Sequence, residues 1–154
     1  MHLTPHFTLQ ELTASQTAAR RGIDNRPNIQ ETRNLTRLAE TLEQVRALVG
    51  RPVIVSSGYR SPALNKAIGG STTSAHMRGL AADFACNGLT PVELARRIAE
   101  SDIVFDQLIY EGTWVHLGLS AAQPRREVLT AHFKGGRTAY TKGLPLSATP
   151  KEIA

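Results

Sequence analysis

Three residues of this sequence could together bind a divalent metal ion. His76 and Asp83 lie seven positions apart, and His116 follows 33 positions after Asp83. Two imidazoles and one carboxylate suit a catalytic zinc ion, because three protein ligands leave the fourth position open for water or substrate. A structural zinc ion normally has four protein ligands. The sequence therefore predicts a catalytic metal site.

The alternative is that each histidine is a surface residue or a hydrogen-bonded core residue. We assign three of the five histidines to that class: His2, His6 and His132. His76 and His116 differ because each stands among polar or turn-forming residues. Asp83 interrupts the apolar run 80–85, and a buried carboxylate needs a cation or several hydrogen-bond donors. This requirement favours one shared site over three unrelated residues.

Two predicted β elements must bring these residues together. Residues 80–85 form one predicted strand, which contains Asp83. Residues 105–111 and 114–119 are strand-like runs separated by a Gly-Thr pair, which is typical of a β-hairpin. The metal site closes only if the fold places this hairpin beside the strand that carries Asp83.

The remaining elements predict an α+β domain. Capping residues and apolar residues spaced by three or four positions predict four helices, at about 9–14, 29–49, 62–68 and 91–99. Two further strands are expected, a buried one at 52–57 and a final one at 128–133. The polar segment 18–27 is rich in turn-forming residues and predicts a surface loop.

The length of 154 residues predicts one domain, 1–154, with an N-terminal helix and arm at 1–28 and a loosely held tail at 142–154. Lys and Arg number 18 against 13 Asp and Glu, so the formal net charge is +5. This charge is compatible with the cell wall, nucleic acid or a membrane surface as partner. The single cysteine, Cys86, excludes an internal disulfide and a Cys-rich zinc module.

Nothing beyond the charge favours nucleic acid or a membrane. The charged residues of the 29–49 helix form an exposed face without the aromatic residues or clustered cations of a nucleic-acid surface. No stretch approaches the roughly 18 consecutive apolar residues of a membrane span. We therefore expect no nucleic-acid partner, no membrane insertion and a monomeric chain.

Three strings of the sequence resemble one enzyme family. Residues 57–62 (SGYRSP), 74–83 (SAHMRGLAAD) and 114–116 (WVH) resemble the zinc D-alanyl-D-alanine carboxypeptidases, which include phage peptidoglycan endopeptidases. The likeness extends over nearly the whole chain and is greatest for the small phage-associated branch. It implies an α+β, hedgehog-like fold in which helices pack on a small antiparallel sheet. It also implies one Zn²⁺ per chain, held by His76, Asp83 and His116, and a bacterial peptidoglycan stem peptide as substrate.

The family reaction needs a general base, and here the sequence departs from the best-known members. Those carry an acidic residue three positions before the last histidine ligand, where this chain has Thr113. Glu111 is the nearest carboxylate, and a two-residue turn would pair it with Trp114 and place it on the same side as His116. Glu111 is therefore the predicted base. The alternatives are a carboxylate that supports the ligands and a plain charge at the hairpin end.

Four further residues are predicted to bind the substrate. Arg60 resembles the family arginine that stabilises the carbonyl oxygen or holds a substrate carboxylate, for which a permanently charged guanidinium is suited. Its alternative role is a surface ion pair. Ser74 is expected to bond to substrate or to order the loop beside His76. Tyr59 and Trp114 are expected to line the groove, or else to pack in the core.

Two functions of different classes follow. The first is a zinc metallopeptidase that cuts stem peptides, as a D,D-carboxypeptidase or a phage-lysin endopeptidase. The alternative is an inactive zinc-containing module of the same fold that binds the cell wall or a phage structural partner, and Thr113 keeps this alternative open. Residues 1–6 lack the basic and apolar order of a signal peptide. We expect a protein made in the cytoplasm that acts on the wall after release or as part of a phage particle.

Overall fold

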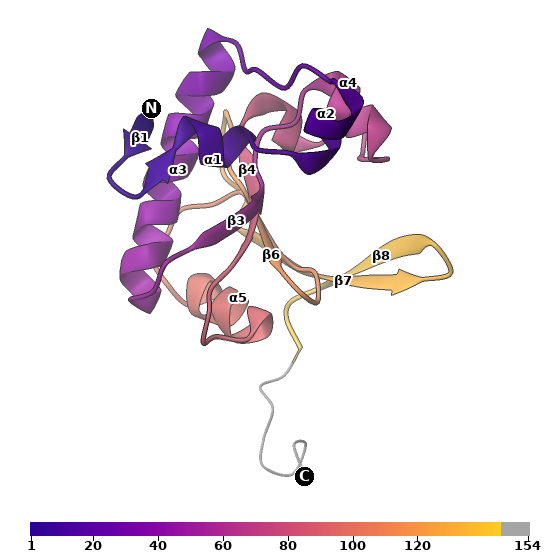
Figure 1. Cartoon of the computed structure of the whole chain (residues 1–154). Coiled ribbons are helices and arrows are strands. Elements are labelled where there is room, and N and C mark those ends of the chain that lie inside the picture. Colours follow the sequence, from indigo (N-terminus) through magenta and orange to yellow (C-terminus); the bar gives the residue numbers. More distant parts are fainter. Residues whose placement is uncertain (146–154) are drawn as a thin grey trace.

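A six-stranded sheet forms the centre of the structure, a computed structural model that describes residues 1–145 (Figure 1). The strands lie in the order β3-β4-β6-β5-β7-β8. Their bounds are β3 (Ile54–Ser57), β4 (Ala81–Ala85), β5 (Gln107–Tyr110), β6 (Val115–Gly118), β7 (Glu127–Lys134) and β8 (Arg137–Lys142). A second sheet near the N-terminus pairs β1 (His2–Thr4) with β2 (Phe7–Thr8).

The α+β class is confirmed, but the main sheet is mixed and larger than the small antiparallel sheet we expected. All neighbouring strands are antiparallel except β5 and β7, which run parallel. Both edges of β6 are already paired, with β4 and β5, so the chain cannot form another strand beside β6. It crosses instead to the outer edge of β5, where Glu127 pairs with Gln107, and β7 therefore runs in the direction of β5.

The two faces of the sheet differ because side chains alternate along each strand. Helices α3 (Ile29–Val49) and α5 (Pro91–Ala99) pack on one face and bury it. The strand residues of this hydrophobic core are Ala82, Phe84, Leu108, Val115 and Leu117. The residues between them point to the opposite face, which carries the predicted metal ligands.

Helix α3 begins and ends at the residues that its sequence signals indicate. The Asn28 side chain accepts a hydrogen bond from the Glu31 backbone, and the Glu31 side chain accepts one from the Asn28 backbone. Gly50 ends the helix in the left-handed conformation, with φ at 66°. No helix in the described part of the chain is long and apolar enough to cross a membrane.

The shorter predicted helices are present with small changes at their ends. Helix α1 (Leu9–Thr13) carries the expected capping box between Thr8 and Glu11. Helix α4 (Pro62–Ala67) starts at the expected Ser61 cap and ends before Ile68. A 3-10 turn that we did not predict, η1 (Ala75–Arg78), directly precedes β4.

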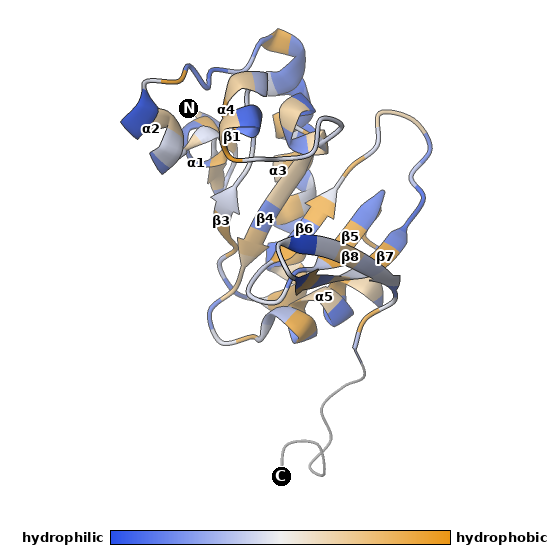
Figure 2. Ribbon diagram, turned by 90° about the vertical axis from the view of Figure 1, so that its right-hand side faces the viewer, coloured by the Kyte–Doolittle hydropathy of each residue, from blue (hydrophilic) through white to orange (hydrophobic). Residues whose placement is uncertain are grey.

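The predicted loop at 18–27 is wrong in its first part, which is the helix α2 (Gln16–Arg21). Ser15 caps this helix by accepting a hydrogen bond from the Ala18 backbone, and Gly22 ends it in the left-handed conformation. The helix is short and only Ala18 is buried, so it lacks the apolar spacing that reveals longer helices. Figure 2 shows α2 at the outside of the molecule with strongly hydrophilic residues at one end.

Two strand predictions also need correction. Strand β3 was predicted to be buried, but it lies at the edge of the sheet, where Ile54 is 47% exposed. A short β-branched run is equally compatible with a buried strand and an edge strand, so the sequence could not distinguish the two. The predicted final strand is β7, but β8 follows it after the glycine pair at 135–136. The tail predicted at 142–154 begins at the last residue of β8, and its part at 146–154 lies outside the described residues.

Candidate metal centre and active-site groove

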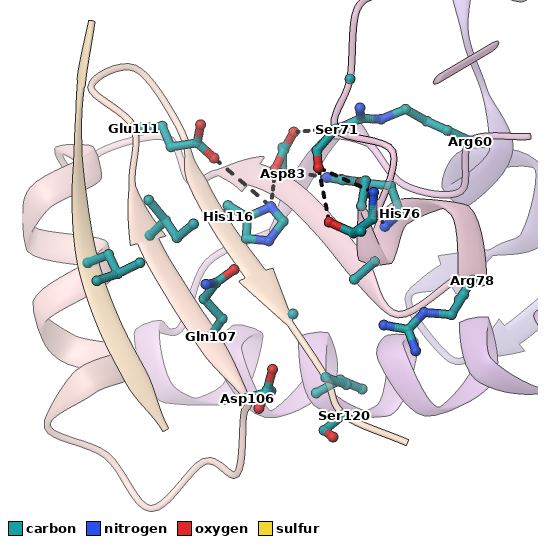
Figure 3. A pocket seen from close by; sticks show the side chains of 18 of the residues that line it. Arg60, Ser71, His76, Arg78, Asp83, Asp106, Gln107, Glu111, His116 and Ser120 are labelled. Carbon is teal, nitrogen blue, oxygen red and sulfur yellow. Dashed lines mark hydrogen bonds and ion pairs between the residues drawn. The ribbon is translucent and has the colours of Figure 1, made fainter. Parts of the chain in front are cut away.

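Strand pairing places two of the three predicted ligands side by side. Asp83 of β4 pairs with His116 of β6, which in turn pairs with Ile109 of β5. Directly paired residues of antiparallel strands share one face of the sheet. Figure 3 shows the Asp83 and His116 side chains pointing toward one another in the pocket on this face.

The third predicted ligand, His76, reaches the same place from η1. Ser74 begins this turn by accepting a hydrogen bond from the His76 backbone at 3.2 Å. Gly79 ends the turn in the left-handed conformation, with φ at 72°, and leads into β4. A Cβ at Gly79 would lie 2.7 Å from the Glu31 carbonyl oxygen, so the close approach of η1 to α3 requires glycine.

The three ligand atoms converge on one point. Asp83 Oδ1 lies 2.9 Å from His116 Nδ1 and 3.4 Å from His76 Nε2. One possible ligand atom from each of the three residues lies within 4.8 Å of the other two. Zinc binds nitrogen and carboxylate oxygen at about 2.0–2.2 Å, so one ion can contact three atoms that are this close. The sequence prediction that these residues come together is confirmed.

The hydrogen bonding of His76 supports this assignment. Its Nδ1 lies 2.7 Å from the Gly58 carbonyl oxygen, which can only accept, so Nδ1 carries the proton. Its Nε2 is buried and has no hydrogen-bond partner among residues 1–145. A metal ligand commonly has this arrangement, because the bond at one ring nitrogen fixes the tautomer that leaves the other nitrogen free to bind metal. The residues present therefore fit a zinc ion.

The charges at this point also favour metal binding. Burial lowers the pKa of His76, which keeps its imidazole neutral. Burial by itself would raise the pKa of Asp83, but contact with the His116 and His76 imidazoles outweighs burial and holds this pKa below its ordinary value. A neutral imidazole and an ionised carboxylate are the protonation states that a metal requires.

Glu111 lies beside the predicted ligands, as the hairpin geometry indicated. The turn after β5 pairs the Glu111 backbone N–H with the Trp114 carbonyl oxygen at 3.0 Å. Glu111 Oε2 then lies 4.0 Å from His116 Nδ1, and the side chain is 16% exposed. Burial, followed by the negative charge of Asp83, raises the pKa of Glu111. Its carboxylate can therefore accept a proton from a group held at the three ligands.

Arg60 approaches the ligands from the opposite side. Its Nη2 lies 3.8 Å from Asp83 Oδ2, and its side chain is 13% exposed. The Asn65 side chain, itself buried, accepts a hydrogen bond from Arg60 Nη1 at 3.1 Å. The Nε atom of Arg60 is buried without a partner among the described residues. The guanidinium is therefore held in place and still has a donor available.

All these groups line one cavity of about 550 Å³. The sequence-predicted residues among its lining are Arg60, Ser74, His76, Asp83, Glu111, Trp114 and His116. The cavity extends past the ligands toward Arg78, Asp106 and Ser120, as Figure 3 shows. It is large enough for a short peptide segment, because ligand sites typically measure about 300–1,000 Å³.

Comparison with known proteins adds one decisive finding. A family model described as Peptidase M15 matches residues 5–118, about three quarters of the chain and the whole of the ligand set. The chain belongs to the peptidase M15 family. M15 peptidases are zinc-dependent and resemble D-alanyl-D-alanine carboxypeptidases, as the sequence strings indicated. The sequence has no match among curated proteins.

Three other predicted residues of this M15 chain have different placements. Tyr59 does not line the groove, because its side chain is 4% exposed and packs in the hydrophobic core. Core packing was the alternative for Tyr59. Ser74 orders the turn that carries His76 and also lines the groove. Trp114 lines the groove, and its buried indole nitrogen has no hydrogen-bond partner among the described residues.

Several residues around the predicted ligands of this M15 chain could not be identified from the sequence. The Asn65 side chain accepts a hydrogen bond from Arg60 and donates one to the Ser71 carbonyl oxygen. The sequence gives little indication of this role, because Asn65 is a single amide in a short helix. The groove also includes Arg78, Gln107, Arg125, Leu129 and Tyr140. Leu129 and Tyr140 belong to β7 and β8, so finding them required the parallel pairing that the sequence did not reveal.

Proposed function

We propose that this protein is a zinc metallopeptidase that hydrolyses a peptide bond in peptidoglycan stem peptides. The observation that carries the proposal is the convergence of His76, Asp83 and His116 with the Glu111 carboxylate on the same side. M15 membership supports a peptidase acting on peptidoglycan. The groove of about 550 Å³ has room for a short peptide segment.

In this proposal Glu111 is the general base. When bound, the zinc ion polarises the scissile carbonyl and lowers the pKa of a water molecule to about 7. Glu111 accepts the proton of the attacking water and then delivers it to the nitrogen of the leaving amine. Its Oε2 lies 4.0 Å from His116 Nδ1, beside the predicted ligands. In this proposal Glu111 takes the place of the acidic residue that the best-known members carry at the position of Thr113.

Arg60 has the electrostatic role. Its Nη2 lies 3.8 Å from Asp83 Oδ2, so the guanidinium faces the position where a substrate oxygen would sit beside the ligands. A permanently charged donor stabilises the negative charge that develops on the carbonyl oxygen, or holds a substrate carboxylate. Asn65 keeps this guanidinium in position. Ser74 and Trp114 complete the walls beside the scissile bond.

The finer assignment is a phage-lysin type of D,D-carboxypeptidase or endopeptidase, which acts on the wall after release from the cytoplasm or within a phage particle. The support for this is the resemblance of residues 57–62, 74–83 and 114–116 to the phage-associated branch. An inactive wall-binding module of the same fold is the other candidate, favoured by Thr113 at the usual base position.

Incubation with purified cell walls tests the proposal. The full chain is mixed with sacculi, with and without a chelator, and the released amino groups and peptides are measured. Hydrolysis that stops with chelator and returns with added zinc supports the peptidase. The Glu111→Gln protein is the matched control, because it keeps the predicted ligands. Binding to sacculi without any hydrolysis would favour the inactive module.

A further inference from the structure

The hairpin of β7 and β8 carries two exposed aromatic side chains. Phe133 is 57% exposed and Tyr140 is 53% exposed. Figure 1 shows the hairpin extending away from the helices and the rest of the sheet. Both strands lie after residue 118, so they lie outside the residues that match the M15 family. Family membership therefore does not explain them.

The exposed face of the hairpin continues the face that carries the predicted metal ligands. One row of paired residues crosses five strands: Asp83, His116, Ile109, Leu129 and Lys142. Residues that pair directly across a sheet share a face. Phe133 and Tyr140 lie on this face, because they are an even number of positions from Leu129 and Lys142 respectively.

Tyr140 joins the hairpin to the groove. The pairing of Tyr110 with Thr130 places Ala131 next to Glu111, and Ala131 pairs with Tyr140. The small alanine side chain leaves space over β7, and both Tyr140 and Glu111 line the cavity. Burial and the charge of Glu111 raise the pKa of Tyr140, which is consistent with this proximity. The groove and the hairpin therefore form one continuous surface.

Phe133 extends this surface beyond the groove. It pairs with Thr138, which places Tyr140 diagonally across from it, within reach of an aromatic side chain. Their cross-strand partners, Thr138 and Ala131, have small side chains, so the two rings stand above a flat surface. Residues 128–142 include three Lys or Arg and no Asp or Glu, and by strand alternation Lys142 lies on this face while Lys134 and Arg137 lie on the opposite one. The surface therefore combines two aromatic rings with the positive charge of Lys142.

We propose that this hairpin surface binds the glycan strand that carries the stem peptide in the groove. The inference rests on the proposed function, since it takes the substrate to be peptidoglycan. Sugar rings present apolar C–H faces that stack on aromatic rings, and their hydroxyl groups bond to side chains such as Thr138 and Lys142. The carboxyl groups of a peptidoglycan strand are complementary to the positive charge of Lys142.

The distance from the site agrees with this occupant. Strand β8 is two strands away from β5, which carries Glu111 at its end, and strands lie about 4.8 Å apart. The separation of about 10 Å is the length of about three extended residues. A stem peptide of a few residues, cut beside Glu111, would therefore reach the hairpin with the end that is attached to the glycan.

Binding by the full chain tests the proposal without relying on catalysis. The probes are intact sacculi and glycan strands freed of stem peptides by an amidase, with co-sedimentation as the readout. Phe133→Ala is expected to weaken binding to both by roughly three- to tenfold, because one aromatic contact is lost. The matched control is His132→Ala, which removes a neighbouring exposed ring from the opposite face of β7 and is expected to stay within about twofold of the parent protein.

A soluble stem peptide without sugar separates this proposal from the proposed function. Phe133→Ala should hydrolyse that peptide at the parent rate and sacculi more slowly. Parent protein that binds glycan through Phe133 but cuts no substrate would keep the hairpin proposal and reject the peptidase. Unchanged glycan binding by Phe133→Ala would overturn the hairpin proposal. Conversion of a dimer to a monomer by this change, seen in sedimentation velocity, would also overturn it in favour of a second copy of the chain.

Discussion

The Nδ1 atom of His76 lies 2.7 Å from the carbonyl oxygen of Gly58, in the loop that follows β3. This contact orients a predicted metal ligand from the backbone of a different element. Gly58 is in turn packed against α1, because a Cβ there would overlap the Leu12 carbonyl oxygen. The orientation of His76 therefore depends on a close backbone approach that only glycine permits.

Gly58→Ala should lower both stability and zinc affinity. The added methyl group meets backbone atoms that cannot rotate away, so the loop must shift, at a cost of about 1–3 kcal/mol. The shift moves the acceptor of His76, and loss of such an acceptor typically reduces metal affinity about 10- to 100-fold. Urea unfolding and zinc titration of the folded variant measure the two effects. Parent values in both would contradict this coupling.

Purified protein should contain one zinc ion per chain. His76→Ala, Asp83→Ala and His116→Ala each remove one of three converging ligand atoms, so each should lose most of the bound metal. Elemental analysis of protein purified without added metal gives the stoichiometry. His132→Ala is the control, since this exposed histidine of β7 is not one of the predicted ligands and bonds to Thr141 of β8. Metal content that is equal in all four variants would reject the site.

The sequence predicted that Glu111 and His116 share a face, because strand alternation and turn length are local properties. A two-residue turn determines that Ile109 pairs with His116, and the structure has this pairing. The alternation of β4 likewise determines that Asp83 points away from Phe84, which is buried in the core. The pairing of β4 with β6 and the turn η1 that carries His76 remained to be established.

The parts that the sequence did not predict depend on contacts between distant segments. The parallel pairing of Ile109 with Leu129 follows from which edges of the sheet are free, a property of the whole fold. Tyr59 could not be assigned, because an aromatic residue beside a glycine is compatible with either a groove or a core. The support of Arg60 by Asn65 joins a loop to a short helix, and no local pattern reports it.

Glu111→Gln should abolish hydrolysis and leave zinc bound. The amide keeps the size of the side chain but cannot accept the proton, and loss of a positioned general base typically costs about 10²–10⁴-fold in rate. Turnover of a stem-peptide substrate, zinc content and the thermal midpoint are measured on the same preparation. Near-parental turnover would place the base elsewhere and would contradict the assignment of Glu111 from the geometry of the β5–β6 hairpin.

Arg60→Ala should also be folded, loaded with zinc and nearly inactive. Removal of a donor that stabilises developing negative charge typically lowers kcat about 10²–10³-fold. Arg60→Lys keeps the charge but loses the fork of donors, including the Nη1 that contacts Asn65, so it should recover only part of the activity. An effect on KM alone would assign Arg60 to ground-state binding of the substrate instead.

The ion pair of Asp106 and Arg125 should stabilise the fold only when Asp106 is ionised. Hydrogen bonds from the Arg125 side chain and backbone lower the pKa of Asp106 below its ordinary value of 3.8. A lowered pKa means that the stabilisation is fully present above the ordinary value and is lost as the pH falls through the lowered one. Asp106→Asn should therefore reduce the free energy of unfolding by about 1 kcal/mol at pH 7, an amount suited to a charged hydrogen bond with a half-exposed partner.

The difference between Asp106→Asn and the parent protein should shrink as the pH falls below 3.8. Urea unfolding from neutral to acidic pH measures this difference. Asp24→Asn is the matched control, because Arg26 donates similar hydrogen bonds to Asp24, two from its side chain and one from its backbone, but both side chains are more than half exposed. Such a surface pair contributes little to stability. An Asp106→Asn difference that stays constant across the titration would show that the ion pair is not its source.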